Sequence, residues 1–365
     1  MNADLKYKIA LSMLPGIGSV LARNLVAYVG SVEEIFSASY NALIKIPGIG
    51  EYNARRIKNA KVIDRAEKEI EFIQKNEIKT SFYTDTPRRL KNCIDAPVII
   101  YSKGKMNLDE HRVISIVGTR NATEYGKQVV DDLIKALAGR DYKILVISGL
   151  AYGIDVCAHR AALKYNVSTV GIMAHGLDML YPALHKKTAQ KMLQNGGLLT
   201  DFPGGTKIDP RNFVKRNRII AGLADATIVV ESAEKGGSLI TADIAASYNR
   251  DVFAFPGRSG DAWSKGCNQL IRNNGAGLIQ GIDDLEYFMG WEKQEKSTAV
   301  QQNLFVDLNE TEQKVVDLLQ QRKELFIDEI SAEMKLPVSR VSSLLLELEF
   351  KNVITAFPGQ MYKLR

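Results

Sequence analysis

The middle of the chain alternates between apolar runs of strand length and longer stretches with helical periodicity. The strand-length runs cover residues 98–101, 113–117, 144–147, 169–173, 227–230 and 252–255, and the helical stretches lie near 124–139, 154–165, 185–194 and 238–249. Strands that are apolar throughout are buried on both faces, and alternation with helices is typical of a parallel sheet. We therefore expect an α/β fold built on a Rossmann-like parallel sheet with helices on both faces.

The segments that follow these strands are rich in glycine and hydroxyl residues. They cover residues 118–121, 148–155, 174–178, 231–241 and 256–257. In a Rossmann-like sheet, ligands bind beyond the carboxyl ends of the strands, where loops meet helix N-termini. Glycines alone are weak support for a site, because turns need them anyway. Several such loops at one edge would nevertheless let a sugar-phosphate backbone approach main-chain N–H groups.

The N-terminal segment carries the motif Pro-Gly-Ile-Gly twice, at residues 15–18 and 47–50, each time between helical patterns. This repeat predicts a helical domain of the helix-hairpin-helix or SAM-like type at residues 1–80. Such hairpins can aim backbone N–H groups at a phosphate, and they can equally serve as tight turns between helices. The sequence leaves open whether either hairpin contacts DNA.

The C-terminal segment predicts a winged-helix domain at residues 309–365, after a polar linker at 291–308. Helical patterns cover 309–321, 327–334 and 338–350, and a hairpin pattern joins 353–357 to 360–364. The third helix carries Glu347 and Glu349 beside its basic residues. That composition suits a major-groove reader poorly, so contact with protein or simple packing explains the helix at least as well.

One short segment concentrates positive charge. Residues 211–218 hold four cations and one aromatic ring. Cations can neutralise phosphates and a ring can pack on a base, which is the combination that grips a single nucleic-acid strand. A run of charge can also be a solvated surface. The formal net charge of +6 favours a polyanionic partner without proving one.

Composition limits the remaining possibilities. The length of 365 residues suggests two or three domains, and the 45% apolar and 25% charged residues are typical of a soluble globular protein. The three cysteines lie far apart, which argues against a disulfide framework or a zinc site and fits a reducing cytoplasm. No apolar run is long enough to span a bilayer. We expect a cytoplasmic protein without a membrane association.

Five motifs together resemble the DprA family of DNA-processing proteins, also called Smf. They lie at residues 116–126, 148–159, 215–222, 236–242, and at 255–257 with 266–271. The resemblance is dense from about residue 110 to 280, and the two flanking domains match longer members of the family. It implies a homodimeric protein that is not an enzyme and uses no cofactor. It would bind incoming single-stranded DNA during natural transformation, protect it, and load the recombinase RecA onto it.

The resemblance also implies a site within the Rossmann-like domain at residues 81–290. Arg120 would pair with phosphate, Phe213 would pack against a base or sugar, and Asn217 would hydrogen-bond the backbone. The small residues of two loops would allow close approach of the strand. The complete predicted site is Arg120, Ser148, Gly149, Arg211, Phe213, Lys215, Arg216, Asn217, Arg218, Lys235, Gly236, Gly237, Ser238 and Thr241. Alternatively, Arg216 or Arg218 pairs with Asp201 or Glu231 and pins the loop.

Other functions fit the sequence less well. Residues 203–206 imitate part of the signature of nucleotide phosphoribohydrolases, a related Rossmann-like group, but no glutamate follows closely to act on a glycosidic bond. A dinucleotide oxidoreductase would need Gly-x-Gly-x-x-Gly, which residues 118–126 lack. The four histidines show no paired spacing for a metal, and Asp155 with His159 suits helix capping and packing better. A sequence-specific regulator would need a strongly basic recognition helix.

Overall fold

The computed structural model describes residues 2–291 and 308–365, which form two compact units, 1–280 and 281–365. Most of the predicted linker, residues 292–307, lies outside the described residues. The finer domain boundaries at residues 80 and 290 stay predictions. Within the described residues, no helix combines the length and the apolar character that crossing a membrane requires.

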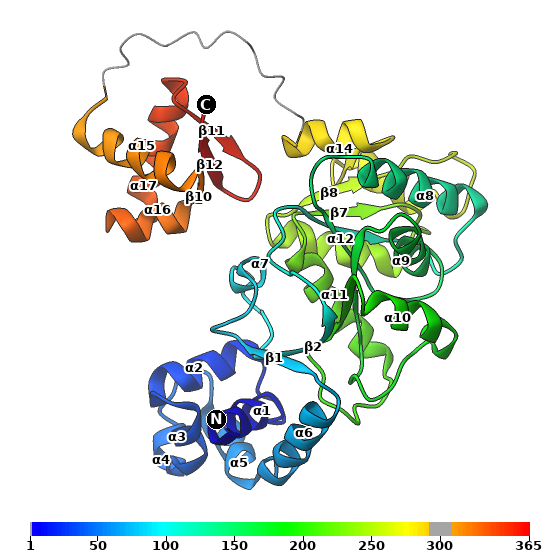
Figure 1. Cartoon of the computed structure of the whole chain (residues 1–365). Helices are drawn as coiled ribbons and strands as arrows, with labels where there is room; N and C mark the ends of the chain where they lie inside the picture. Colours follow the sequence, from blue (N-terminus) through cyan, green and yellow to red (C-terminus); the bar gives the residue numbers. More distant parts are fainter. Residues whose placement is uncertain (1, 292–307) are drawn as a thin grey trace. The chain divides into compact units, whose positions relative to one another are not determined.

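The first unit begins with a cluster of six helices (Figure 1). These are α1 (Asn2–Ser12), α2 (Ser19–Val29), α3 (Val32–Ser37), α4 (Tyr40–Leu43), α5 (Gly50–Asn59) and α6 (Ile63–Lys75). The two Pro-Gly-Ile-Gly motifs form the turns before α2 and α5. Gly16 and Gly48 adopt φ angles of +77° and +81°, which favour glycine. The predicted helix-hairpin-helix domain is confirmed.

The rest of the first unit is built around a nine-stranded sheet. Its strands are β1 (Lys79–Phe82), β2 (Ile99–Lys105), β3 (Val113–Val117), β4 (Leu145–Ser148), β5 (Ser168–Ile172), β6 (Gly196–Thr200), β7 (Ala226–Val229), β8 (Asp251–Ala254) and β9 (Gly277–Leu278). Their order is β1-β2-β6-β5-β4-β3-β7-β8-β9. All neighbours from β6 to β9 are parallel, as predicted for β3, β4, β5, β7 and β8; β6 and β9 themselves were not predicted.

Two strands at one edge differ from the prediction of a wholly parallel sheet. β2 pairs antiparallel with β6, and β1 pairs antiparallel with β2. The apolar run at 98–101 was therefore correctly expected to form a strand, but its direction in the sheet was wrong. The reason is that Ile99 and Tyr101 pack into the core of the helical domain. This edge of the sheet belongs to two hydrophobic cores at once.

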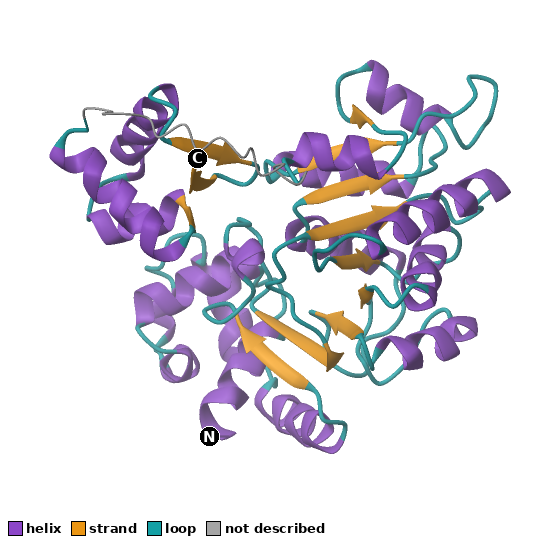
Figure 2. Ribbon diagram, turned by 45° about the horizontal axis from the view of Figure 1, so that its top comes forward, coloured by secondary structure: helices purple, strands orange, loops and turns teal. Residues whose placement is uncertain are grey.

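Helices cover both faces of the sheet (Figures 1 and 2). On one face lie α8 (Glu124–Ala138), α9 (Ile154–Lys164), the 3₁₀ helix η1 (Ala183–His185) and α10 (Lys186–Met192). On the other lie α7 (Arg88–Lys91), α11 (Pro210–Leu223) and α12 (Gly237–Ser247), and α13 (Lys265–Arg272) packs on β8. The second face buries residues that are almost wholly apolar, among them Ile147, Ile219 and Val229.

The strand order reverses at β3, which lies between β4 and β7. Parallel register aligns the ends of the three strands, with Ser115 opposite Ile147 and Val117 opposite Val229. Main-chain bonds also join the loops beyond them, because Thr119 N donates to Glu231 O at 2.7 Å and Ile154 N to Thr119 O at 3.1 Å. The loops after β3, β4 and β7 therefore meet at one edge, where ligands of such sheets bind.

The second unit contains the predicted winged helix. Its elements are α14 (Ile282–Met289), α15 (Glu310–Arg322), β10 (Glu324–Phe326), α16 (Ile327–Met334), α17 (Val338–Phe350), β11 (Ile354–Phe357) and β12 (Met361–Leu364). Asn309 and Glu312 form a capping box that starts α15. The helix α14 and the short strand β10, which pairs with β12, were not predicted. Leu319, Ile330 and Leu345 are fully or almost fully buried in the core of the domain.

Candidate nucleic-acid interface

The basic run at residues 211–218 lies on a helix, α11, and not on a loop. Asp209 caps this helix by accepting a hydrogen bond from Arg211 N at 2.8 Å, and Pro210 occupies its first position. A helix turns neighbouring side chains about 100° apart, so the cations cannot share one surface. Lys215 is exposed, whereas the next residue, Arg216, is only 3% exposed.

Three accessible side chains gather where α11 meets the carboxyl edge of the sheet. Arg120, exposed in the loop after β3, holds its guanidinium 5.6 Å from the centre of the Phe213 ring. Tyr181 meets the same ring edge-on at 6.0 Å and is 40% exposed. Lys215, also exposed, lies two residues after Phe213 on α11, about 200° around the helix from that ring. A cation beside two rings can bind a phosphate and stack a base, and Lys215 can bind a second phosphate. We name Arg120, Phe213, Lys215 and Tyr181 the α11 site.

Arg211 lies farther out on the same helix. Its side chain is 84% exposed and pairs with Asp209, the residue that caps α11, at 2.6 Å. The side-chain and main-chain hydrogen bonds from Arg211 lower the pKa of Asp209 to about 2. The carboxylate therefore offsets much of the positive charge that Arg211 could offer to a phosphate.

The buried side chain of Arg216 bonds to main-chain carbonyls at the carboxyl edge of the sheet. Its Nη1 donates to the carbonyl of Gly149 at 2.7 Å and also to the carbonyl of Ile172, at the ends of β4 and β5. Burial lowers the pKa of Arg216 to about 10, and the negative charge of Asp155 opposes that shift. Its guanidinium is thus buried and hydrogen-bonded within the protein. We assign Arg216 a positioning role instead of the predicted direct contact with DNA.

Ser148 and Gly149 are also buried and already bonded. The Ser148 hydroxyl donates to the Ile116 carbonyl at 2.6 Å. Gly149 donates its N–H to the Asp155 carboxylate at 3.2 Å and accepts from Arg216. A Cβ at Gly149 would overlap the Arg216 guanidinium. This glycine therefore makes room for an arginine, and not for the DNA backbone that the sequence suggested.

Arg218 forms an ion pair within the protein, which is the alternative that the sequence left open. It pairs with Asp201 and donates to the carbonyl of Asp95, and both charged side chains are largely buried. The pair ties α11 to the loop that leads into it. Asn217, between the two buried arginines, is half-buried.

The loop after β7 likewise contains both exposed and buried residues of the predicted site. Lys235 and Gly237 are exposed and Gly236 is half-buried. Ser238 and Thr241 are buried, and the Ser238 hydroxyl donates to Ser232 Oγ at 2.9 Å. The helix α12 begins here without a side-chain cap. The accessible part of this loop is residues 235–237.

A buried polar layer lies under the site. His159 is fully buried, with Nδ1 2.7 Å from the Thr169 hydroxyl, and burial lowers its pKa to about 3. Asp155 is buried at the start of α9, and burial raises its pKa. Both residues are packed as predicted, but Asp155 does not cap α9, whose N-cap is Gly153. Across residues 2–291 and 308–365, no cluster of three His, Cys, Asp or Glu side chains could hold a metal ion.

Two aromatic residues were missed by the sequence analysis. Tyr181 follows β5, and Tyr152, 43% exposed in the loop after β4, packs edge-on against His185 at 5.1 Å. Tyr152 lies in a glycine-containing loop that the analysis had singled out, so a search of that loop for rings would have found it. Tyr181 lies just beyond the segment 174–178, and only the fold brings it to Phe213.

A second missed feature holds the loop that leads into α11. Glu69 of α6 is buried, accepts a hydrogen bond from Gly204 N at 2.9 Å, and pairs with Arg65 at 3.1 Å. Arg65 in turn donates to the carbonyl of Gly204. The helical domain therefore fixes the path of this loop through Arg65, Glu69 and Gly204, which we name the Glu69 clasp.

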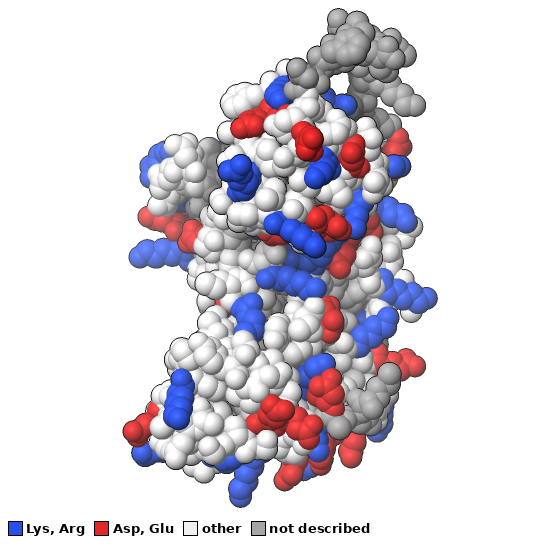
Figure 3. Space-filling model, turned by 90° about the vertical axis from the view of Figure 1, so that its left-hand side faces the viewer, with Lys and Arg blue, Asp and Glu red and all other residues white. Residues whose placement is uncertain are grey.

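Surface charge alone does not locate the site. On the face drawn in Figure 3, Lys and Arg side chains are interspersed with Asp and Glu. The net charge of +6 is thus not concentrated in one positive patch on that face. The contacts of individual side chains, and not the total charge, single out the α11 site.

Comparison with known proteins decides the family. Residues 77–290 match the model of DNA recombination-mediator protein A, residues 8–60 match a SAM-like helix-hairpin-helix tandem, and residues 305–360 match the DprA winged-helix domain. Protein Smf of Escherichia coli is 33% identical over 288 residues, which are 76% of this chain and 75% of that protein. The chain belongs to the DprA family.

Solved DprA structures share the fold. DNA processing protein A from Streptococcus pneumoniae is 28% identical, with a TM-score of 0.65 over 77% of this chain and 97% of that one. DNA processing protein A from Helicobacter pylori is 29% identical, with a TM-score of 0.52 over 57% of this chain and 94% of that one, and its structure is described as showing a single-stranded DNA binding mode. DprA proteins are DNA recombination mediators, not enzymes.

Proposed function

We propose that this DprA-family protein binds single-stranded DNA at the α11 site. The observation that carries the proposal is the exposed Arg120 guanidinium over the Phe213 ring, with Lys215 on the same helix. A ring can stack on any base and a cation can neutralise any phosphate, so such a site grips a strand without reading its sequence. A duplex hides its base faces and would lose the contribution from stacking.

The remaining accessible residues extend this proposed site. Asn217 on α11, and Lys235, Gly236 and Gly237 at the start of α12, would contact the strand beyond the central ring, and Arg211 would contribute weakly because of Asp209. The buried members of the predicted set would act by holding the loops in place. These are Ser148, Gly149, Arg216, Arg218, Ser238 and Thr241.

The wider role rests on membership of the family. We propose that the protein protects incoming strands in the cytoplasm and loads the recombinase RecA onto them during natural transformation or homologous recombination, and that it acts as a homodimer. In this role the protein would hold DNA in a form that the recombinase can take over. No covalent chemistry on the DNA is required.

A recombinase-loading assay tests this role. Single-stranded DNA is first covered with a single-strand-binding protein, and RecA assembly is followed through its DNA-dependent ATP hydrolysis. We expect the wild type to shorten the lag before hydrolysis and the Arg120→Ala/Lys215→Ala variant to leave the lag unchanged. If both proteins shortened the lag equally, recombinase loading would not depend on the α11 site. If the wild type had no effect on the lag, the loading role would be contradicted.

A further inference from the structure

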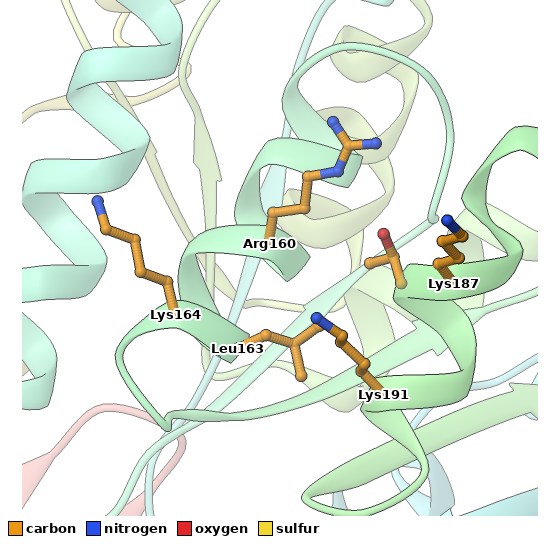
Figure 4. Close-up of a pocket in the computed structure, with 6 residues that line it drawn as sticks. Arg160, Leu163, Lys164, Lys187 and Lys191 are labelled. Atoms are coloured by element: carbon orange, nitrogen blue, oxygen red, sulfur yellow. The ribbon is translucent and has the colours of Figure 1, made fainter.

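A basic groove lies on the opposite face of the sheet from α11. It has a volume of about 400 Å³ and opens between α9 and α10 (Figure 4). Its lining residues are Arg160, Leu163, Lys164, Lys187, Thr188 and Lys191. Nothing in the sequence motifs pointed to it, because its residues come from two helices that are brought together only by the fold.

The charge in the groove is of one sign. Lys164 turns away toward α8, where it pairs with Asp131 at 3.0 Å (Figure 4). Within the part of the chain that the structure describes, no hydrogen bond or ion pair engages the side chains of Arg160, Lys187 or Lys191. A cleft lined by like charges concentrates the electric field and attracts an opposite charge. The groove therefore favours an anionic ligand.

The shape suits a chain with both charged and apolar parts. Leu163 is half-buried and contributes an apolar surface between the two helices. Lys191 extends across the groove toward Leu163, while Arg160 and Lys187 stand at its upper end (Figure 4). The stems of such side chains are apolar and only their ends are charged. A sugar-phosphate backbone offers the matching alternation of apolar sugars and charged phosphates.

A series of contacts through the loop after β4 links the groove to the α11 site. Gly153 packs so closely on Arg120 that a Cβ there would lie 2.7 Å from Arg120 Cα. Tyr152, the preceding residue, contacts the ring of His185, which directly precedes α10. The contacts thus lead from Arg120 over Tyr152 to the start of α10, and an exposed ring stands between the two groups of cations.

We propose that a single DNA strand held at the α11 site continues past Tyr152 into the α9–α10 groove, where Arg160, Lys187 and Lys191 bind its phosphates. This inference rests on the proposed function. The contacts that link the groove to the α11 site and the exposed ring of Tyr152 favour a nucleic-acid strand over an acidic peptide, which would use neither. The groove adds length and strength to the grip without adding sequence preference.

Strands of two lengths test the proposal. Binding of a fluorescent oligo-dT of about 8 nucleotides and of one of about 20 is measured by anisotropy over a range of salt concentrations. The groove variant is Lys187→Gln/Lys191→Gln. Its matched control is Lys135→Gln/Lys143→Gln, which removes the same charge from exposed positions at the end of α8 and before β4. The Arg120→Ala/Lys215→Ala variant reports on the α11 site.

We expect the groove variant to bind the short strand as the wild type does and the long strand about tenfold more weakly, with a salt slope reduced by about 1.4 for two lost phosphate contacts. Groove and control variants that bind both strands alike would overturn the groove inference while leaving the α11 site intact. A wild type that binds neither strand would overturn the proposed function and the groove together.

Discussion

At the scale of single residues, the basic run on α11 divides into cations that face solvent and cations that hold the fold. Lys215 is exposed, and its neighbour Arg216 is buried against the carbonyls of Gly149 and Ile172. The number of cations in the run therefore does not give the number of cations that can reach DNA. The helix, and not the composition of the run, decides which of the two can reach a phosphate.

Replacing each of these neighbours by methionine separates the two roles. We expect Lys215→Met to change the free energy of unfolding by less than about 0.5 kcal/mol and to lower the salt slope of strand binding by about 0.7. Arg216→Met leaves two buried carbonyls without a donor, so it should cost about 2–4 kcal/mol of stability. Urea denaturation and anisotropy measure the two quantities.

The opposite pattern would contradict the assignment. If Arg216→Met kept the stability of the wild type and reduced strand binding as much as Lys215→Met does, Arg216 would be a phosphate ligand and not a positioning residue.

The buried imidazole of His159 makes stability depend on pH. Burial, and then the charges of Arg216 and His185, lower its pKa from 6.5 to about 3. The unfolded chain therefore takes up a proton near pH 6.5, whereas the folded chain does not until about pH 3. The stability contributed by the neutral ring is complete above pH 6.5 and is lost as the pH falls toward 3.

A neutral substitute at His159 isolates this effect. Relative to His159→Gln, the wild type should lose up to about 1.4 kcal/mol of stability per pH unit below its unfolded pKa. Because Asp155 is present in both proteins, its own titration largely cancels. Urea denaturation at about pH 7.5 and about pH 5.5 measures the difference. Parallel losses in the two proteins would mean that His159 does not remain neutral in the fold.

The sequence predicted which loops carry the site better than it predicted which atoms are available. Arg120, Phe213 and Lys215 were expected; the structure brings Arg120 to the Phe213 ring and leaves Lys215 exposed on the same helix as that ring. Ser148 and Gly149 were expected as donors, but their hydrogen bonds are already made within the protein. Ser148 bonds to a residue 32 positions away, and the Gly149 carbonyl accepts from Arg216, 67 positions away, so no local pattern reveals these bonds. The ring of Tyr181 was missed for the same reason, since only the fold brings it to Phe213.

At the scale of elements, periodicity and turn residues were sufficient where each element buries one continuous face. The helices α15, α16 and α17 lie within one residue of their predicted bounds. The predicted strand direction was wrong for β2, which contributes side chains to two hydrophobic cores. β2 reads as an ordinary apolar run, but its direction depends on the helical domain against which Ile99 packs. Strand direction is a tertiary property that the alternation of apolar runs does not encode.

The Glu69 clasp links two elements that are distant in sequence. It lets α6 fix the loop that leads into α11, so its loss should act on the α11 site without removing any contact to DNA. We expect Glu69→Ala to cost about 1–3 kcal/mol and to speed hydrogen exchange at the Gly204 amide. Glu67→Ala, on the same helix but exposed, should change stability by less than about 0.5 kcal/mol.

Hydrogen exchange followed by NMR or mass spectrometry distinguishes the two variants. Equal protection of Gly204 in both would show that Glu69 does not hold this loop. The loop would then owe its path to its own residues, among them Asp201, which pairs with Arg218.

At the scale of the whole molecule, the first unit holds every residue of the α11 site and of the groove. The winged helix in the second unit has acidic residues near the end of α17 and apolar side chains exposed on it, including Leu346 and Phe350. These features suit contact with a protein better than contact with a phosphate backbone. DNA binding is therefore expected to depend mainly on the first unit.

The most direct test of the central claim compares labelled oligo-dT with its matching duplex at low and moderate salt. The wild type and the Arg120→Ala/Lys215→Ala variant are measured side by side, and thermal unfolding confirms that both are folded. We predict that the wild type prefers the single strand, with log affinity falling by about 0.7 per phosphate contact for each unit of log salt, and that the variant loses this binding. Equal affinity for strand and duplex, or unchanged binding by the folded variant, would contradict the claim that the α11 site grips single-stranded DNA.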